Sequence, residues 1–376
     1  MDNLSAPAGR DGIGRRSRLT VVAGTIRTLT ERVLNRALLA RQHLLRRSTA
    51  SLPAMLESVG GLQMQYVPSG YIGCWSRLEG VTRAQVTRAL ERRQVVQATL
   101  LRSTIHLVSA ADYPVLFTAT RDSRTDNGAR AAKMRRLDPL DYDALADRVR
   151  GWFADGPLER TELLDRLAAE GVDRAHWETL SQWLELVRVP PQGTWERRRA
   201  HLYGLASREL PGADARIDAV AAMELLVERY LGGFGPARRD DLASWAGMPV
   251  GAFDDALDRM PVRTFADADG RELVDLPRRP LPDASTHAPV RFLGTWDATL
   301  LVHARRTQIL PEEHRDKVFH IRRPHSVNTV LVDGQVAGTW TIDPARGVVV
   351  EPFDPIPTRF RDELEDERVA LEAFVG

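Results

Sequence analysis

This 376-residue sequence contains two glutamines separated by one residue, and their type and spacing suggest a catalytic site. Gln63 and Gln65 stand in the stretch GLQMQYVPSG, residues 61–70. In extended backbone, alternate side chains project to the same side, so both amides would point one way and Met64 the other, whereas a helix would splay them apart. We therefore expect an extended segment here, and Pro68 and Gly70 favour a non-helical continuation.

Glutamine amides have no useful pKa, which limits the reactions that they can catalyse. The carbonyl oxygen can orient water or face a developing cation, and the NH₂ group donates hydrogen bonds. Hydrolysis of the N-glycosidic bond to a cationic, N-alkylated purine suits such groups, because the positively charged base leaves without being protonated. What remains is to stabilise an oxocarbenium-like sugar and to hold a water molecule on its open face. The alternative is that Gln63 and Gln65 are surface or capping amides, which is the commoner role of glutamine.

The rest of the sequence contains no other pattern typical of a catalytic site. It shows no nucleophile–base motif, phosphate-binding loop, metal-ligand pair or carboxylate dyad. The single cysteine, Cys74, cannot form an internal disulfide, and no Cys/His set has zinc-ligand spacing. No apolar run is long enough to span a membrane. These features favour a cytoplasmic protein without a metal or other cofactor.

Positive charge is concentrated in the first part of the chain. Residues 1–136 hold 22 Lys and Arg against 9 Asp and Glu, a balance of +13, and the remaining residues hold 30 against 42, a balance of −12. A basic block beside a globular domain is the usual electrostatic signature of a polyanionic partner. A solvated basic face with a loose tail is the alternative explanation of the same balance.

Three segments of similar pattern begin at Gly80, Gly156 and Gly235, which are 76 and 79 residues apart. Each is followed by an amphipathic helical stretch and then by a run with strand character, and these runs cover residues 95–110, 184–205 and 261–277. A short helix pair followed by a two-stranded hairpin is the plan of a winged helix. The predicted fold class is α+β, with three tandem winged-helix units and a C-terminal strand-rich part. The predicted parts are a loose basic tail (1–27), N-terminal helices with the first winged helix and both glutamines (28–140), a second winged helix (141–210), a third (211–280), and a C-terminal strand-rich region with a terminal helix (281–376).

Local signals predict several elements within these parts. A helical stripe covers residues 31–47, and Ser51 opens a second helix. Asp269-Gly270 and Asp333-Gly334 are typical two-residue hairpin turns. Residues 111–140 are polar and basic and are predicted to be a long loop. Further strands and a final charged helix are predicted over residues 291–302, 328–343, 347–353 and 360–373.

The hairpins supply the candidate contacts to nucleic acid, because winged helices commonly place basic side chains of the second helix or the wing on phosphates. The candidates in the first and second hairpins are Arg102, Ser103, Thr104, His106, Arg188, Gln192, Arg197, Arg198 and Arg199. His106 stands in an alternating strand, where a buried structural histidine is the alternative. Arginine clusters are often only solvated, and some winged helices mediate protein contacts alone.

Seven segments of the sequence together resemble one family of bacterial winged-helix proteins. They are LNRALLARQHLLRR, GLQMQ, SRLEG, LLRSTIHLVSA, VRVPPQGTWERRRAHLYGLA, RYLGGFGPARRDDLASWAGM and WDATLLVHARR. Over about residues 33 to 345 the sequence resembles the AlkZ-like DNA glycosylases. The resemblance implies three tandem winged helices forming a concave basic surface for double-stranded DNA. It also implies excision of N7-alkylated purines, including bulky adducts and interstrand crosslinks, with Gln63 and Gln65 as the catalytic residues of a Gln-aliphatic-Gln element.

The function that combines these observations is a monomeric, monofunctional DNA glycosylase of the bacterial cytoplasm, serving DNA repair or self-resistance to a genotoxin. No lysine stands in a motif for a Schiff-base nucleophile, which disfavours a lyase mechanism. A crosslinked base is tethered to both strands, so we expect an open, groove-facing site and not a closed pocket. One alternative is a winged-helix transcription regulator that binds DNA without catalysis, although three unlike wings argue against symmetric half-site recognition. Another is a protein-interaction scaffold, which would show no salt-dependent DNA affinity.

Overall fold

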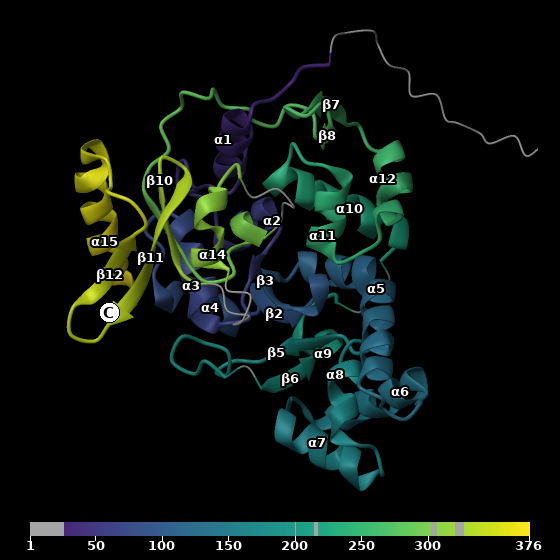
Figure 1. Ribbon diagram of the computed structural model, residues 1–376. Coiled ribbons are helices and arrows are strands. Elements are labelled where there is room, and N and C mark those ends of the chain that lie inside the picture. Colours follow the sequence, from purple (N-terminus) through teal and green to yellow (C-terminus); the bar gives the residue numbers. More distant parts are fainter. Residues whose placement is uncertain (1–25, 200, 214–216, 302–306, 320–326) are drawn as a thin grey trace, which may run out of the picture.

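The computed structural model describes residues 26–199, 201–213, 217–301, 307–319 and 327–376. Helices and strands are mixed along these residues, and the predicted α+β class is confirmed (Figure 1). The predicted basic tail, residues 1–27, lies outside the described residues except for Ile26 and Arg27. Within the described ranges, no helix combines the length and apolar character needed to cross a bilayer.

The first winged-helix region begins with two helices that the sequence predicted. The first of them is shorter than expected, because α1 ends at Arg41, and Ser51 caps the second as predicted by accepting a hydrogen bond from the N–H of Ala54. The first hairpin, β2 with β3, is also confirmed. The elements are α1 (Glu31–Arg41), α2 (Leu52–Val59), β1 (Leu62–Gln63), α3 (Val67–Arg77), α4 (Arg83–Glu91), β2 (Val95–Thr99) and β3 (Ile105–Ser109).

The non-helical continuation predicted after the glutamines is wrong, because helix α3 starts at Val67. Pro68 lies in the first turn of α3, where a proline replaces an N–H that has no partner within the helix. Gly70 does not break the helix either. It leaves room for Met64, since a Cβ at Gly70 would lie 2.6 Å from the Met64 Sδ. Both residues therefore allow the helix to start close behind the glutamine pair.

The loop predicted for residues 111–140 is also wrong, because residues Asp112–Met134 form the long helix α5. Its sequence is too polar to show a clear apolar stripe, and tertiary contacts supply the burial instead. The Arg124 guanidinium is buried, lies 4.0 Å from the centroid of the Phe117 ring, and donates to the carbonyl of Gln182. In Figure 1, α5 runs from the third winged-helix region at the top to the second at the bottom.

The first two hairpins belong to one sheet, which sequence patterns did not indicate. Its strand order is β1-β3-β2-β5-β6-β4, and the antiparallel pairing of β2 with β5 joins the two winged-helix regions. The helices and strands of the second region are α6 (Tyr142–Trp152), β4 (Leu158–Glu159), α7 (Arg160–Ala169), α8 (Trp177–Leu180), β5 (Leu186–Arg188), β6 (Leu202–Leu205) and α9 (Ala206–Glu209).

The third region has its own two-stranded sheet. Strands β7 and β8 pair as predicted, so this hairpin is confirmed. Its turn is longer than the predicted two residues, because the N–H of Gly270, at a φ of +77°, donates to the carbonyl of Asp267. The elements are α10 (Ala219–Phe234), α11 (Arg239–Ala246), α12 (Asp254–Arg259), β7 (Arg263–Ala266) and β8 (Glu272–Asp275). Short 3₁₀ segments along the chain are η1 (Leu101–Ser103), η2 (Phe153–Asp155), η3 (Arg174–His176), η4 (Val250–Phe253), η5 (Glu312–His314) and η6 (Thr358–Phe360).

The C-terminal part is a four-stranded antiparallel sheet of order β12-β11-β10-β9, with α15 packed beside it (Figure 1). The turn at Asp333-Gly334 and the final helix are confirmed. The strand predicted over residues 291–302 is wrong in its second half, where α13 forms. The elements are β9 (Arg291–Leu293), α13 (Ala298–Leu301), α14 (Arg315–Val318), β10 (Thr329–Val332), β11 (Gln335–Asp343), β12 (Gly347–Pro352) and α15 (Arg361–Val375).

Two buried ion pairs connect the N-terminal helices to later parts of the chain. Arg77, at the end of α3, donates two hydrogen bonds to Asp297, and both side chains are at most 3% exposed. Arg41, at the end of α1, is paired in the same way with Asp275 of β8. Met64 lies in a hydrophobic core that includes α2, α3 and the C-terminal sheet. The glutamine segment is therefore held between several parts of the fold.

Candidate active site

Strand β1 places Gln63 at the edge of the six-stranded sheet, and Gln65 follows just after the strand. Gln63 pairs with His106 of β3, and the N–H of Met64 donates to the carbonyl of Ile105 at 2.7 Å. The Met64 side chain is fully buried, whereas Gln63 is half-buried and Gln65 is exposed. The predicted extended backbone is confirmed for Leu62 and Gln63, and Gln65 follows in a bend; Met64 is directed into the core and the two amides are left outside it.

The first hairpin holds the carbonyl oxygens of both amides. The Arg102 guanidinium donates to Gln63 Oε1 at 2.9 Å, and the N–H of Ile105 donates to Gln65 Oε1 at 3.1 Å. Guanidinium and backbone N–H groups are donors only, so the acceptor in each case must be the amide oxygen and not its nitrogen. Each oxygen keeps a second lone pair, and each NH₂ group remains a donor for a further partner. The pair can therefore present both an acceptor and a donor to a bound substrate.

The tip of this hairpin has an unusual backbone. Arg102 and Ser103 have φ values of +53° and +56°, and the N–H of Thr104 donates to the carbonyl of Leu101, as in a type I′ turn. Residues other than glycine cost roughly 1–2 kcal/mol each in this conformation. The structure brings Arg102, Ser103 and Thr104 next to the glutamines, as the sequence predicted.

A small cavity adjoins Gln65 on the side of the second winged-helix region. Its volume is about 100 Å³, and Gln65, Ser103 and Arg188 are among its lining residues. The Arg188 guanidinium is 9% exposed, donates to the Thr99 hydroxyl at 3.2 Å, and has its pKa lowered by burial. An apolar cavity of about 150 Å³ is filled by one benzene molecule, so this cavity is too small for an extruded purine.

The loop between β5 and β6 brings the second group of predicted residues to the same side. Trp195 anchors this loop in the core, Arg197, Arg198 and Arg199 are exposed, and Arg198 donates to the Tyr66 hydroxyl at 3.3 Å. Tyr66 follows Gln65 directly, so Arg198 lies near the glutamine pair. Gln192 is half-buried in the same loop, and its described contacts do not join it to the pair.

His106 is buried, which agrees with the alternative of a structural histidine and not with a DNA contact. It is 3% exposed, and its Nδ1 lies 3.0 Å from the carbonyl of Thr104. Burial lowers the pKa of His106 to about 3, and the charge of Arg102 acts in the same direction. The ring is therefore neutral at physiological pH.

The pKa of His106 leads to a prediction about stability. The unfolded chain has a histidine pKa of about 6.5, so between that value and about 3 the unfolded state binds more protons than the folded state. We expect the free energy of unfolding to fall as the pH drops below 6.5, with a contribution of up to about 1.4 kcal/mol per pH unit from this residue. Urea unfolding between pH 7.5 and 4.5 should show a shallower decline for His106→Gln than for the wild type. The exposed His287, changed to Gln, is the control, and parallel curves for the wild type and His106→Gln would contradict the prediction.

Some residues near the site were missed from sequence. Tyr66 is 48% exposed and follows Gln65. An aromatic residue directly beside the glutamine pair was a signal in the sequence that could have identified it as a site residue. A second hollow beside Arg102 and Ser103 is lined by residues in and just after α5 and α8, which lie far from the glutamines in the sequence and form no motif with them. They are Asn127, Gly128, Ala131, Arg135, Glu178, Thr179 and Gln182.

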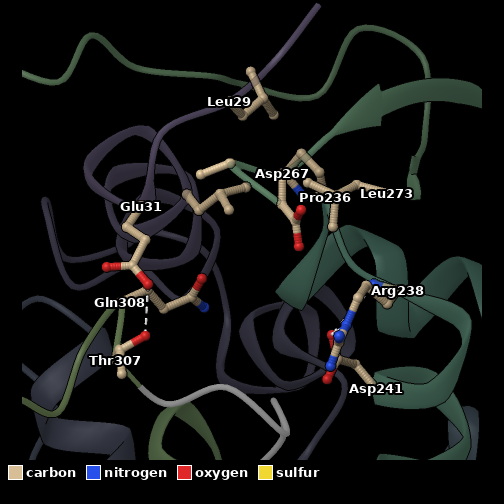
Figure 2. A pocket seen from close by; sticks show the side chains of 11 residues that line it. Leu29, Glu31, Pro236, Arg238, Asp241, Asp267, Leu273, Thr307 and Gln308 are labelled. Atoms are coloured by element: carbon tan, nitrogen blue, oxygen red, sulfur yellow. Dashed lines mark hydrogen bonds and ion pairs between the residues drawn. The ribbon is translucent and has the colours of Figure 1, made fainter. Parts of the chain in front are cut away.

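The pocket in Figure 2 lies elsewhere, between the start of α1, the third winged-helix region and residues 307 and 308. Glu31 accepts a hydrogen bond from the Thr307 hydroxyl there at 2.6 Å. None of the predicted site residues lines this pocket. Within the described part of the chain, no group of three or more His, Cys, Asp or Glu side chains is arranged to hold a metal ion.

Comparison with known proteins identifies the class. The chain matches the family described as DNA glycosylase AlkZ-like over residues 56–374, and it therefore belongs to this family. It is a DNA N-glycosylase, a hydrolase that acts on DNA.

Among solved structures, the chain is similar to the Streptomyces sahachiroi DNA glycosylase AlkZ. The two share 20% sequence identity and superpose with a TM-score of 0.79 over 92% of this chain and 97% of that chain. This similarity shows a common fold, and the arrangement of three hairpins described above is compatible with three winged-helix units. A search of the curated proteins found no match.

Proposed function

We propose that this DNA glycosylase hydrolyses the N-glycosidic bond of N7-alkylated purines in double-stranded DNA, with Gln63 and Gln65 as its catalytic residues. The observation that carries the proposal is the pair of amides at one sheet edge, both fixed through their carbonyl oxygens by the same hairpin. Dipoles that are already oriented stabilise a developing charge without reorganisation, which is the main source of their catalytic effect.

The proposed reaction needs no strong acid or base. The bond from C1′ to N9 breaks, and its electron pair leaves with the cationic purine, which becomes neutral. The carbonyl oxygen of one amide directs its remaining lone pair at the oxocarbenium-like sugar. The carbonyl oxygen of the other amide orients the water that attacks C1′, and the water proton passes to solvent. This mechanism uses no lysine nucleophile, so the enzyme is proposed to be monofunctional and to leave an abasic site.

The size of the cavity beside Gln65 supports an open site. Glycosylases commonly extrude the target base into a pocket. The cavity that Gln65 lines has only about 100 Å³, and the hollow of about 320 Å³ beside Arg102 is lined by neither glutamine, so we propose that the lesion is attacked while it faces the groove. Such a site accommodates bulky adducts and interstrand crosslinks as well as small alkyl groups. These substrates are in keeping with DNA repair or genotoxin self-resistance in the bacterial cytoplasm, by a protein that acts as a monomer.

Base release from a duplex with a single N7-methylguanine tests the proposal. Treatment with alkali cuts the strand at abasic sites, and the products separate on a gel. We expect cleavage well above that of a no-enzyme control. Release at the spontaneous rate from this duplex and from one carrying a bulky N7 adduct would contradict the proposal, and duplex bound without excision would favour the transcription regulator.

The exposed arginines of the loop between β5 and β6 are proposed to contact phosphates. Replacing Arg197, Arg198 and Arg199 together by Ala should weaken duplex binding about 10- to 100-fold near 0.1 M salt and reduce the slope of log K against log salt by up to about 0.9 per lost contact. Fluorescence anisotropy over a salt series measures both. Excision at saturating enzyme should change little.

A control with the same change of net charge is available in the C-terminal part. Arg315, Arg346 and Arg361 are exposed there and should tolerate replacement by Ala without an effect on DNA affinity. An equal loss of affinity in the two triple variants would indicate a general effect of net charge and would remove this assignment.

A further inference from the structure

Arg102 lies between the glutamine pair and the third winged-helix region. Its Nη2 donates to Gln63 Oε1 at 2.9 Å, and its Nη1 donates to the carbonyl of Trp245 at 2.5 Å. Trp245 is in the last turn of α11, where the helix dipole is negative and favours a cation. Two acceptors of the protein itself therefore hold the guanidinium, which is partly buried.

The backbone around Arg102 is shaped to keep this arrangement. Arg102 has a φ of +53°, and a Cβ at Gly247, the residue that ends α11, would lie 2.9 Å from the Arg102 Cα. Gly247 itself has a φ of +73°, and its carbonyl accepts a hydrogen bond from the Ser123 hydroxyl of α5 at 2.6 Å. A strained turn, a close backbone contact with the end of α11 and a hydrogen bond from α5 thus hold the side chain opposite Gln63.

The hydrogen bond to Gln63 has consequences for its chemistry. Because arginine only donates, the bond determines which end of the Gln63 amide faces Arg102, and it thereby fixes the directions of the second lone pair of the oxygen and of the NH₂ group. A charged donor on the carbonyl oxygen also polarises the amide and strengthens the hydrogen bonds that its NH₂ group makes. Burial lowers the pKa of Arg102 to about 10, so the guanidinium stays charged at neutral pH.

We propose that Arg102 is a positioning residue, which sets the amide of Gln63 for excision and does not act as a phosphate contact. The inference rests on the proposed catalytic role of Gln63. Through Arg102, the glutamine pair is connected to helix α11, whose Trp245 lies 143 residues after Arg102 in the sequence. A displacement of about 1 Å in a catalytic group can cost about 100-fold in rate, so the loss of this support should affect the chemical step.

The test separates binding from chemistry. Single-turnover excision of N7-methylguanine at saturating enzyme gives the rate of the chemical step, and anisotropy over a salt series gives the affinity and its salt slope. For Arg102→Gln we expect the saturating rate to fall about 10- to 100-fold, with the dissociation constant within about twofold of the wild type and an unchanged salt slope. Arg346→Gln, an exposed arginine of the C-terminal part, is the matched control and should leave both the saturating rate and the affinity unchanged.

Two further variants distinguish positioning from charge and from misfolding. Gly247→Ala changes no charge but pushes a Cβ against the Arg102 backbone, and it should lower the saturating rate without altering the salt slope. Arg102→Lys keeps the charge but loses the planar guanidinium that reaches two acceptors. Its saturating rate should therefore lie between those of Arg102→Gln and the wild type. Thermal unfolding of each variant shows that the rates refer to folded protein.

Two results would overturn the inference. One is an unchanged saturating rate in folded Arg102→Gln. The other is weaker binding of that variant with a salt slope reduced by about 0.9, as expected for a lost phosphate contact. Failure of the proposed function looks different, because the wild type itself would then release no base from either lesion.

Discussion

Replacing Gln63 and Gln65 together by Ala is expected to lower the rate of N7-methylguanine excision by about 10³-fold or more, to the spontaneous rate. Removing one preorganised hydrogen-bonding group from a catalytic site typically costs about 10²–10³-fold, and this variant removes both groups that face the sugar and the water. Duplex affinity should stay within about twofold, because neither amide carries charge. Single-turnover base release and anisotropy on the same samples measure the two effects.

Gln335 provides the matched control for this double variant. It is an exposed glutamine of the C-terminal sheet, and Gln335→Ala should excise at the wild-type rate. The single variants Gln63→Ala and Gln65→Ala should each fall between the wild type and the double variant. If the double variant still released base at the normal rate, the catalytic assignment of both glutamines would have to be withdrawn.

Replacing Asp297 by Ala is expected to lower the free energy of unfolding by about 3–5 kcal/mol, the cost of breaking a buried ion pair. Arg77 donates to both oxygens of Asp297 at 2.8 and 2.9 Å, and its side chain is fully buried, so the variant leaves a cation without its counterion in the core. Urea unfolding at neutral pH measures the change. Because the pair connects α3 with the C-terminal part, the loss should also lower the melting temperature of the whole chain.

An exposed ion pair shows the contrast. Glu162 and Arg166 pair along α7 with both side chains at least 40% exposed, and Glu162→Ala should cost less than about 1 kcal/mol. A cost of similar size in the two variants would mean that Arg77 gains solvent or another acceptor when Asp297 is removed. That outcome would contradict the prediction of a rigid, dry ion pair.

Local signals predicted those elements of the fold that depend on neighbouring residues. Ser51 caps α2, Asp333-Gly334 forms the expected hairpin turn, and Gly270 lies in the turn of the hairpin expected between β7 and β8. The same signals failed where distant contacts compensate for an unfavourable local pattern. Helix α5 lacks a clear apolar stripe, yet it is held by buried contacts such as that of Arg124 with the Gln182 carbonyl. The start of α3 at Val67 escaped prediction because Pro68 and Gly70 suit a loop equally well.

The candidate site could be predicted in part. Alternation in an extended segment correctly placed Gln63 and Gln65 outside the core and Met64 within it. The candidates of the first hairpin and Arg198 of the second lie near the pair, as expected. The inward hydrogen bonds of Arg102 were not predictable, because an arginine at a hairpin tip ordinarily reaches solvent or phosphate. Its acceptors are set by Trp245, which no local pattern connects to residue 102.

The sequence by itself determined the pair of amides, the basic character of the first 136 residues and the succession of helix pairs and hairpins, since each depends on residue type and short spacing. Only the tertiary structure decided how these parts meet. The pairing of β2 with β5 joins two hairpins in one sheet, and the contact of Gly247 with Arg102 brings α11 against the glutamine pair. Such contacts arise from packing between segments many residues apart, for which residue spacing along the chain carries no information.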